Sequence, residues 1–166
     1  MKGLNMSEDF EKIIERELSR LPTYSIEIGV FSANRRRKMW WWKYRLKLNN
    51  AELMFIHENG SPANNIPDRP VLDLTIKHFR QNGMIERVVD RALSAYISSN
   101  FDREALEKEL NKLCIRMENY AREIIYSNDG RLKPNSPKVA KKKKGNHPLF
   151  DTGQLARSIT CRLVKS

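Results

Sequence analysis

The stretch from Asp102 to Tyr126 constrains the fold of this chain more than any other part of the sequence. Its apolar residues are spaced four, three, four, three and four positions apart: Leu106, Leu110, Leu113, Met117, Tyr120 and Ile124. This spacing places a narrow apolar stripe along one long helix, and such a stripe needs a partner helix to cover it. The residues from Met84 to Ile97 also show helical spacing, so we predict that the two stretches form a helical hairpin.

Both ends of the chain carry the pattern of a strand. Apolar and polar residues alternate from Tyr24 to Phe31, and they alternate again from Ile159 to Val164. Alternation of this kind is typical of strands that are buried on one face only. We expect the two strands to pair, so that both ends of the chain build one sheet.

Other segments add helices to this frame. A helix is predicted to run from Ser7 to Pro22 with one apolar face turned inward: Phe10, Ile13, Ile14, Leu18 and Leu21. Another is predicted over 71–81, ending at a break at 82–83. The residues 51–57 suit either a helix or a short buried strand. We therefore predict one α+β domain over residues 1–166, with a small, mostly antiparallel β-sheet packed against helices that include the long helical hairpin.

The formal charge of +11 is concentrated in two segments. Residues 35–47 and 131–145 each hold seven lysines and arginines and no acid, so the rest of the chain carries 17 basic residues against 20 acids. The chain is therefore a nearly neutral body with two basic segments. Such segments favour a negatively charged partner, either nucleic acid or an acidic protein surface.

The two basic segments differ in character. Residues 35–47 mix charge with Trp40, Trp41 and Trp42, and we expect a basic-aromatic hairpin there. Arginine beside aromatic rings serves single-stranded nucleic-acid grooves and protein interfaces alike, so both interpretations stay open. Residues 128–146 hold prolines and no apolar period, and they are predicted to be a mobile basic loop.

The residues contain no pattern that predicts an enzyme. The three histidines, His57, His78 and His147, are isolated from one another, and the chain has neither a glycine-rich phosphate loop nor a nucleophile elbow. Cys114 and Cys161 are far apart in the sequence, and we expect both to be reduced, buried thiols. We therefore expect no catalytic residue, no metal and no cofactor.

The sequence also bears on location. No apolar run approaches the roughly 18 residues that cross a bilayer, and the first residues lack the apolar core of a signal peptide. The sequence therefore predicts no membrane partner and no export by that route.

Two segments stand out in the sequence, IHENGSPANNIPDRPVL at residues 56–72 and a basic loop with its following turn at residues 136–159. They resemble the two signatures of a family of tailed-bacteriophage virion morphogenesis proteins. Residues 56–72 are similar to the family's "hE-G…iPaRPfl". Residues 136–159, SPKVAKKKKGNHPLFDTGQLARSI, are similar to its basic loop followed by "PLidTGqLrnSI". The two segments cover about 40 residues, and their order and the helical stretch between them also match. Members of this family are tail-completion proteins, also described as tail-terminator or head–tail joining (neck) proteins.

The resemblance implies a structural role without catalysis. It implies a ring, often a hexamer, that contacts the tail tube protein and the head–tail connector in the virion after assembly in the host cytoplasm. The residues carried over are taken to be structural and interface positions: His57, Glu58, Gly60, Pro67, Arg69, Pro70, Pro148, Leu149, Asp151, Thr152, Gly153, Gln154, Leu155, Ser158 and Ile159.

Three specific expectations follow within these segments. Arg69 is expected to pair with a carboxylate, with Glu58 as one candidate. Asp151 is expected to cap the backbone amides of the turn at 152–154, with Leu155 turned inward.

The basic residues are where this chain departs from the family pattern. Contact with an acidic partner, or transiently with genomic DNA, is expected of these: Arg35, Arg36, Arg37, Lys38, Trp41, Lys141, Lys142, Lys143 and Lys144. The alternative function that they indicate is a basic cytosolic nucleic-acid-binding protein. Against it, the long helix 102–126 mixes acids and bases and has no basic face of the kind a recognition helix needs.

Overall fold

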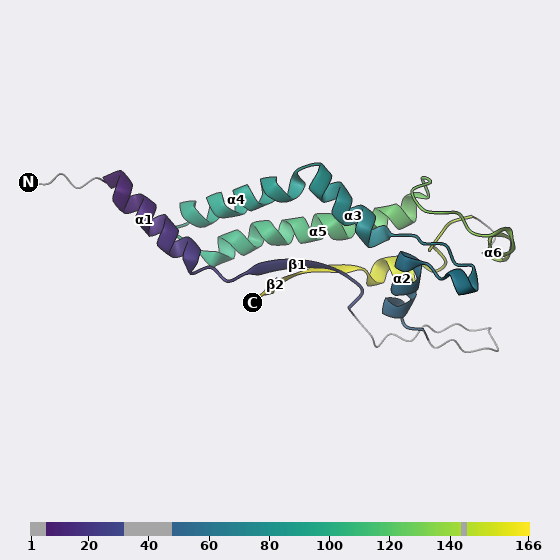
Figure 1. The fold of residues 1–166 in the computed structure, drawn as a ribbon. Coiled ribbons are helices and arrows are strands. Elements are labelled where there is room, and N and C mark those ends of the chain that lie inside the picture. The colour runs from purple at the N-terminus through teal and green to yellow at the C-terminus, as the bar shows by residue number, and fades with distance from the viewer. Residues whose placement is uncertain (1–5, 32–47, 144–145) are drawn as a thin grey trace, which may run out of the picture.

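A computed structural model describes residues 6–31, 48–143 and 146–166, with side chains from residue 9 onward in the first range (Figure 1). The elements are α1 (Met6–Ser19), β1 (Tyr24–Gly29), α2 (Asn50–Asn59), the 3-10 helix η1 (Pro62–Asn64), α3 (Val71–Gln81), α4 (Met84–Ser98), α5 (Arg103–Ser127), α6 (Pro137–Lys143), α7 (Gln154–Ser158) and β2 (Thr160–Lys165). The fold is α+β, as predicted, with helices packed on a small antiparallel sheet of two strands in this part of the chain.

The predicted helical hairpin is confirmed by α4 and α5, which lie side by side along the molecule (Figure 1). Asp102 caps α5, because its carboxylate accepts the backbone N–H of Glu104 at 3.0 Å. The predicted stripe of α5 is buried except for Tyr120, which is half-buried and stacks on the ring of His78 at 4.1 Å between centroids. The break at Gly83 has a positive φ of 59°, which lets α4 continue at an angle to α3 while both helices pack on α5 (Figure 1).

The predicted pairing of the chain ends is confirmed as well. β1 and β2 are antiparallel, with Ile28 opposite Cys161 and Ile26 opposite Leu163. The sheet packs on α5, and the hydroxyl of Tyr24 donates to Glu107 Oε1 at 2.9 Å. Both cysteines are free thiols, as expected, but only Cys114 is buried and Cys161 is half-buried. The expected hairpin at 35–47 lies outside the described residues.

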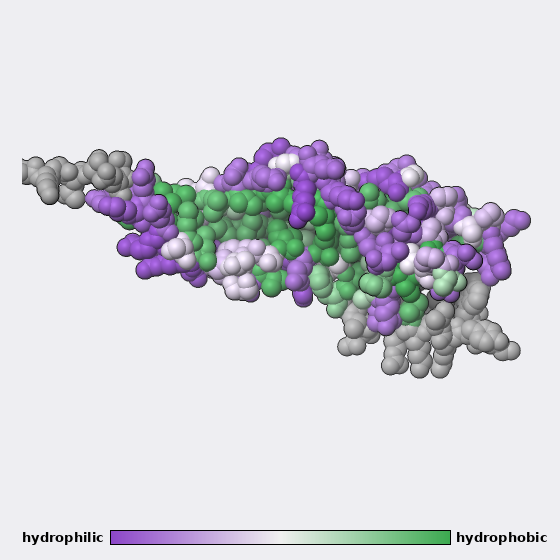
Figure 2. All heavy atoms as spheres, in the orientation of Figure 1, coloured by the Kyte–Doolittle hydropathy of each residue, from purple (hydrophilic) through white to green (hydrophobic). Residues whose placement is uncertain are grey.

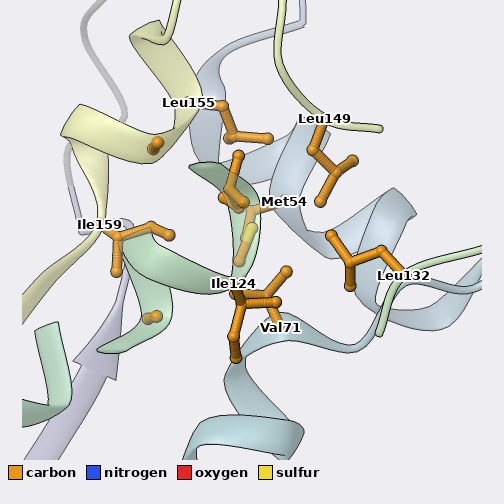
Figure 3. Close-up of a cluster of buried hydrophobic side chains, with 10 residues drawn as sticks. Met54, Val71, Ile124, Leu132, Leu149, Leu155 and Ile159 are labelled. Atoms are coloured by element: carbon orange, nitrogen blue, oxygen red, sulfur yellow. The ribbon is translucent and has the colours of Figure 1, made fainter. Parts of the chain in front are cut away.

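Two apolar cores lie along the length of the molecule. One is built around α4 and the first half of α5 and includes Phe79, Tyr96 and Leu113. The other joins α2, α3, the end of α5 and the segment around α7, as Figure 3 shows: Met54, Val71, Ala121, Ile124, Ile125, Leu132, Leu149, Leu155, Ala156 and Ile159. This second core supports the region in which the two signature segments meet.

Two segments form helices where the sequence predicted a loop or left a helix and a strand both open. The residues 51–57 belong to a helix, α2, whose N-terminus carries a capping box between Asn49 and Glu52. The loop predicted over 128–146 contains the helix α6, which begins at Pro137, and the carbonyl of Ser136 accepts the first helical N–H groups. A proline in the first helical position is a start signal that the lysine run obscured.

The predicted inward face of α1 is wrong for most of its residues, although Ile14 is half-buried and Leu21, just after the helix, packs against the core of α4 and α5. Phe10, Ile13 and Leu18 are exposed. The carboxyl end of α1 contacts the body, where Glu17 O accepts from the Tyr96 hydroxyl at 3.4 Å. Figure 1 shows α1 at one end of the molecule, beyond the helical hairpin, with the amino end of the helix pointing away from the body.

Candidate functional site

The two signature segments line one pocket of about 370 Å³. The first contributes His57, Pro67 and Arg69, and the second contributes Leu149, Asp151 and Leu155, with residues near α6 between them. The remaining lining residues are Leu53, Asn65, Ile66, Asn135, Ser136, Val139 and Lys143. Segments about 80 positions apart in the sequence therefore form one site.

The first signature is a tight turn between α2 and α3. Gly60 ends α2 with φ 73° and ψ 177°, a conformation that is essentially restricted to glycine. Ser61 and Ile66 then pair as a bridge around η1. The N–H of Arg69 donates to the carbonyl of His57 at 2.6 Å, which closes the loop onto the end of α2. Pro67 and Pro70 restrict the backbone of the same turn.

Glu58 caps the N-terminus of α3 from outside that helix. Its carboxylate accepts the N–H of Leu72 at 3.1 Å and the N–H of Asp73 at 2.8 Å. Burial raises the pKa of Glu58, and these backbone N–H groups oppose the rise because they favour the carboxylate. Pro70 occupies the cap position of α3 and supplies no side-chain bond, so Glu58 takes over that role.

Replacing Glu58 with alanine is therefore expected to lower the free energy of unfolding by about 1–2 kcal/mol, because two N–H groups of α3 lose their acceptor. Urea unfolding followed by circular dichroism measures this. The matched control is Glu86→Ala, since Glu86 is exposed in the first turn of α4; we expect a change within about 0.5 kcal/mol. Equal losses in the two variants would contradict the capping role of Glu58.

The expected pair of Arg69 with Glu58 is wrong. Arg69 is 5% exposed and donates through Nε to Lys133 O at 2.7 Å and through Nη2 to Pro134 O at 2.9 Å. The guanidinium therefore joins the first signature to the backbone that leads into α6. Burial lowers the pKa of Arg69. Asp68, the residue before it, pairs with Lys133, whose hydrogen bond lowers the pKa of Asp68.

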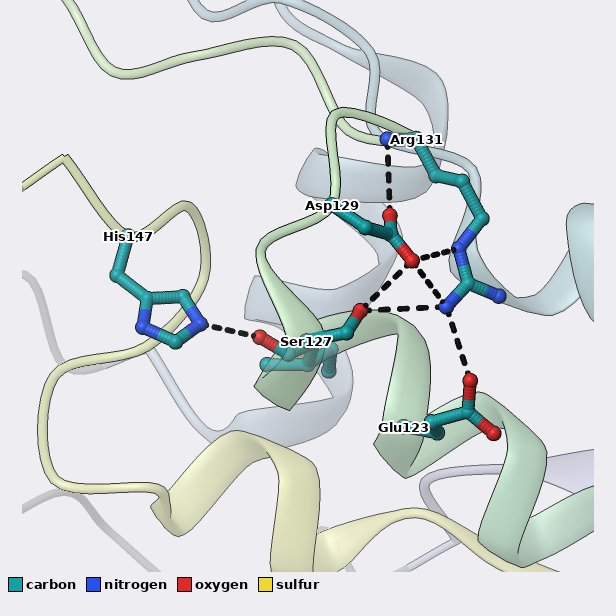
Figure 4. A network of polar contacts seen from close by, with 6 residues as sticks. Glu123, Ser127, Asp129, Arg131 and His147 are labelled. Carbon is teal, nitrogen blue, oxygen red and sulfur yellow. Dashed lines mark hydrogen bonds and ion pairs between the residues drawn. The ribbon is translucent and has the colours of Figure 1, made fainter.

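The second signature is held against the end of α5. His147 Nε2 lies 2.7 Å from the carbonyl of Ile125 (Figure 4). Asn135 connects residues 146–147 to the neighbouring backbone that Arg69 holds. The N–H of Asn135 donates to Asn146 Oδ1 at 3.0 Å, and its side-chain amide donates to His147 O at 3.2 Å. Leu149 adopts a positive φ of 58° and is buried in the core below the pocket.

The turn at the second signature also differs from expectation. Asp151 is exposed at the pocket, and Gly153 precedes α7 without any side-chain cap. The carbonyl of Thr152 instead accepts Arg157 Nη2 at 2.9 Å. Leu155 points into the core, as predicted, and the Ser158 hydroxyl donates to Leu155 O at 2.6 Å.

Two arginines near the end of α5 hold the surrounding backbone. Arg122 pairs with Glu118 at 2.7 Å and donates to Ile159 O at 3.0 Å, where α7 passes into β2. Figure 4 shows Arg131 contacting Glu123, Ser127 and Asp129 at the carboxyl end of α5. The hydrogen bond from Arg131 holds the pKa of Asp129 well below its usual range.

Sequence reasoning missed Asn135, Arg122 and the role of His147. The backbone carbonyls that these side chains bind are between 12 and 37 positions away, and no local pattern marks such contacts. The predicted basic residues are only partly placed. Lys141 and Lys142 are exposed on α6, and Lys143 Nζ donates to Phe150 O at 3.1 Å beside the pocket. Residues 35–38, Trp41 and Lys144 lie outside the described residues.

The polar groups of this site chiefly bind backbone and define its shape. Within residues 6–31, 48–143 and 146–166, no group of three His, Cys, Asp or Glu residues could hold a metal ion. No helix in the part of the chain that the structure describes is long and apolar enough to cross a membrane.

No family model, curated protein or solved structure matches this chain.

Proposed function

We propose that this chain is a structural virion protein of a tailed bacteriophage that completes or terminates the tail and joins it to the head connector as a ring. The observation that carries the proposal is the meeting of the two segments that resemble the family signatures around one pocket. Residues from both segments therefore lie together in the fold. Glu58, Arg69 and His147 hold them there by binding backbone groups of neighbouring elements.

A rigid site of this kind supports a structural role. Its arginine and carboxylate are committed to holding helices and loops together, so the site offers a fixed surface to a partner. The exposed lysines of α6 stand beside the pocket and add positive charge at its edge. They suit an acidic neighbouring protein, or weak and transient contact with the DNA that passes through a tail tube.

Deleting the gene from its parent phage tests the proposal. We expect the lysate to contain filled heads separate from tails when it is examined by negative-stain electron microscopy. Overlong tails would identify a terminator, and unattached tails of normal length would identify a joining protein. A plasmid copy of the gene should restore whole particles. Intact infectious particles without the gene would overturn the proposal.

Nucleic-acid binding is the second candidate, and the exposed lysines of α6 are the observation that favours it. Binding through phosphates alone weakens by orders of magnitude between low salt and about 0.2 M salt. A filter-binding or mobility-shift titration on duplex DNA therefore separates the two candidates. Tight retention of DNA at that salt concentration favours the second candidate, and its loss favours the virion role.

A further inference from the structure

Among the residues that the structure describes, none covers the apolar stripe of α1. Phe10 is 53% exposed, Ile13 37% and Leu18 36%, and Ile14 on the same face is half-buried. The spacing of these residues is that of a helix that packs on another surface. A monomeric protein rarely exposes such a stripe without a partner for it.

The same molecule has an apolar groove without an occupant among the described residues. Its volume is about 340 Å³, and it lies between β1 and the helices α3 and α4, with α5 as its floor. Its aliphatic lining residues include Ile26, Ile28, Ile76, Ile85, Val89 and Met117. Figure 2 shows a hydrophobic band along this face of the molecule, between α4 and β1.

The α1 helix of the same chain does not fill this groove. Its carboxyl end is held near Tyr96, and the carbonyl of Arg20 accepts Arg103 Nη2 at 2.9 Å at the same end of the hairpin. Ile85 lies 11 positions before Tyr96 on α4, which is about 16 Å along the helix. Figure 1 shows α1 leading away from the body beyond that end.

The helix and the lining of the groove differ in charge. α1 carries five acids and two basic residues. Among the residues that line the groove, the charged one is Arg80. Opposite charges favour this encounter over one between two copies of α1.

We propose that α1 of one copy docks in the groove between β1 and α3–α4 of a second copy. Because the helix and the groove are different surfaces, this contact is head-to-tail, and repeating it produces a closed ring or an open filament. This inference rests on the proposed function, because it identifies the contact between adjacent copies in the proposed ring.

Photo-crosslinking of the full chain tests the contact. Phe10 is replaced by p-benzoylphenylalanine, and isotopically labelled and unlabelled chains are mixed before irradiation, so that mass spectrometry separates crosslinks between chains from those within one chain. We expect crosslinks between chains that join position 10 to peptides within residues 76–89. The matched control carries the same group at Phe55, which is 70% exposed on α2, and should not mark these peptides.

Crosslinks from position 10 within one chain, to residues 35–47, to any other surface, or to nothing would overturn the inference. A second measurement uses Phe10→Ser, which should weaken self-association in sedimentation equilibrium by about tenfold or more, with Phe55→Ser as its control. Equal weakening by both variants would also overturn it.

The two proposals fail separately. If α1 does not contact the groove but the deletion phage lacks joined particles, the virion role stands and only this contact is wrong. If α1 crosslinks to the groove but the deletion phage is infectious, the contact stands and the virion role is wrong.

Discussion

Replacing Arg69 with methionine is expected to lower the free energy of unfolding by about 3 kcal/mol. The guanidinium is buried and donates to the carbonyls of Lys133 and Pro134, which lie 64 and 65 positions away in the sequence. Methionine keeps most of the side-chain volume but removes every donor, so both carbonyls lose a charged partner. Equilibrium unfolding in urea, followed by circular dichroism, measures the loss.

Two further variants make this result specific. Arg91 is exposed on α4, and Arg91→Met should change the free energy of unfolding by less than about 0.5 kcal/mol. Arg69→Lys keeps the charge but has a single nitrogen in place of the guanidinium fork, so it should recover less than half of the loss. If Arg69→Met were as stable as Arg91→Met, the buried fork would not hold the first signature to the backbone that leads into α6.

Replacing Gly60 with alanine is expected to cost about 3 kcal/mol or more of the free energy of unfolding. The first reason is the backbone, whose φ of 73° and ψ of 177° disfavour any residue with a Cβ. The second is crowding, since an added Cβ would lie 2.9 Å from Asp68 N and 3.1 Å from Ile66 O. Both neighbours are backbone atoms of the same tight turn, so neither can move without disturbing the α2–α3 connection. Thermal and urea unfolding measure the change.

Gly130 provides the control for the effect of a positive φ alone. It also has a positive φ, 91°, but an added Cβ would meet no atom within 4 Å. Gly130→Ala should therefore cost about 1 kcal/mol. The excess loss in Gly60→Ala reports the crowding in the turn together with the ψ of 177° at Gly60. Equal losses at the two positions would show that the close backbone approach at Gly60 contributes nothing.

The long helical hairpin and the pairing of β1 with β2 could be predicted because both follow from local periodicity. The 4–3 spacing of α5 requires a partner helix, and alternation at both chain ends favours a shared sheet. The helix α6 also has a local start signal, a serine before a proline, although the lysine run that follows is more typical of a solvated loop.

The contacts of the site could not be predicted, because they join a side chain to distant backbone. The spacing of Glu58 and Arg69 suggested a pair, whereas each binds main-chain groups that only the fold brings near. The α1 stripe shows a related limit. A helical stripe indicates that something covers it, but the same pattern serves a contact within one chain or between two chains.

Labelling of purified particles tests the proposed virion role most directly. An antibody against this chain, or against an exposed tag on it, is bound to purified phage particles and detected with colloidal gold in the electron microscope. The proposed role predicts gold at the junction of head and tail, and quantitative mass spectrometry of the same particles should find several copies of the chain in each virion. Absence of the chain from purified particles, or gold only at the distal end of the tail, would contradict it.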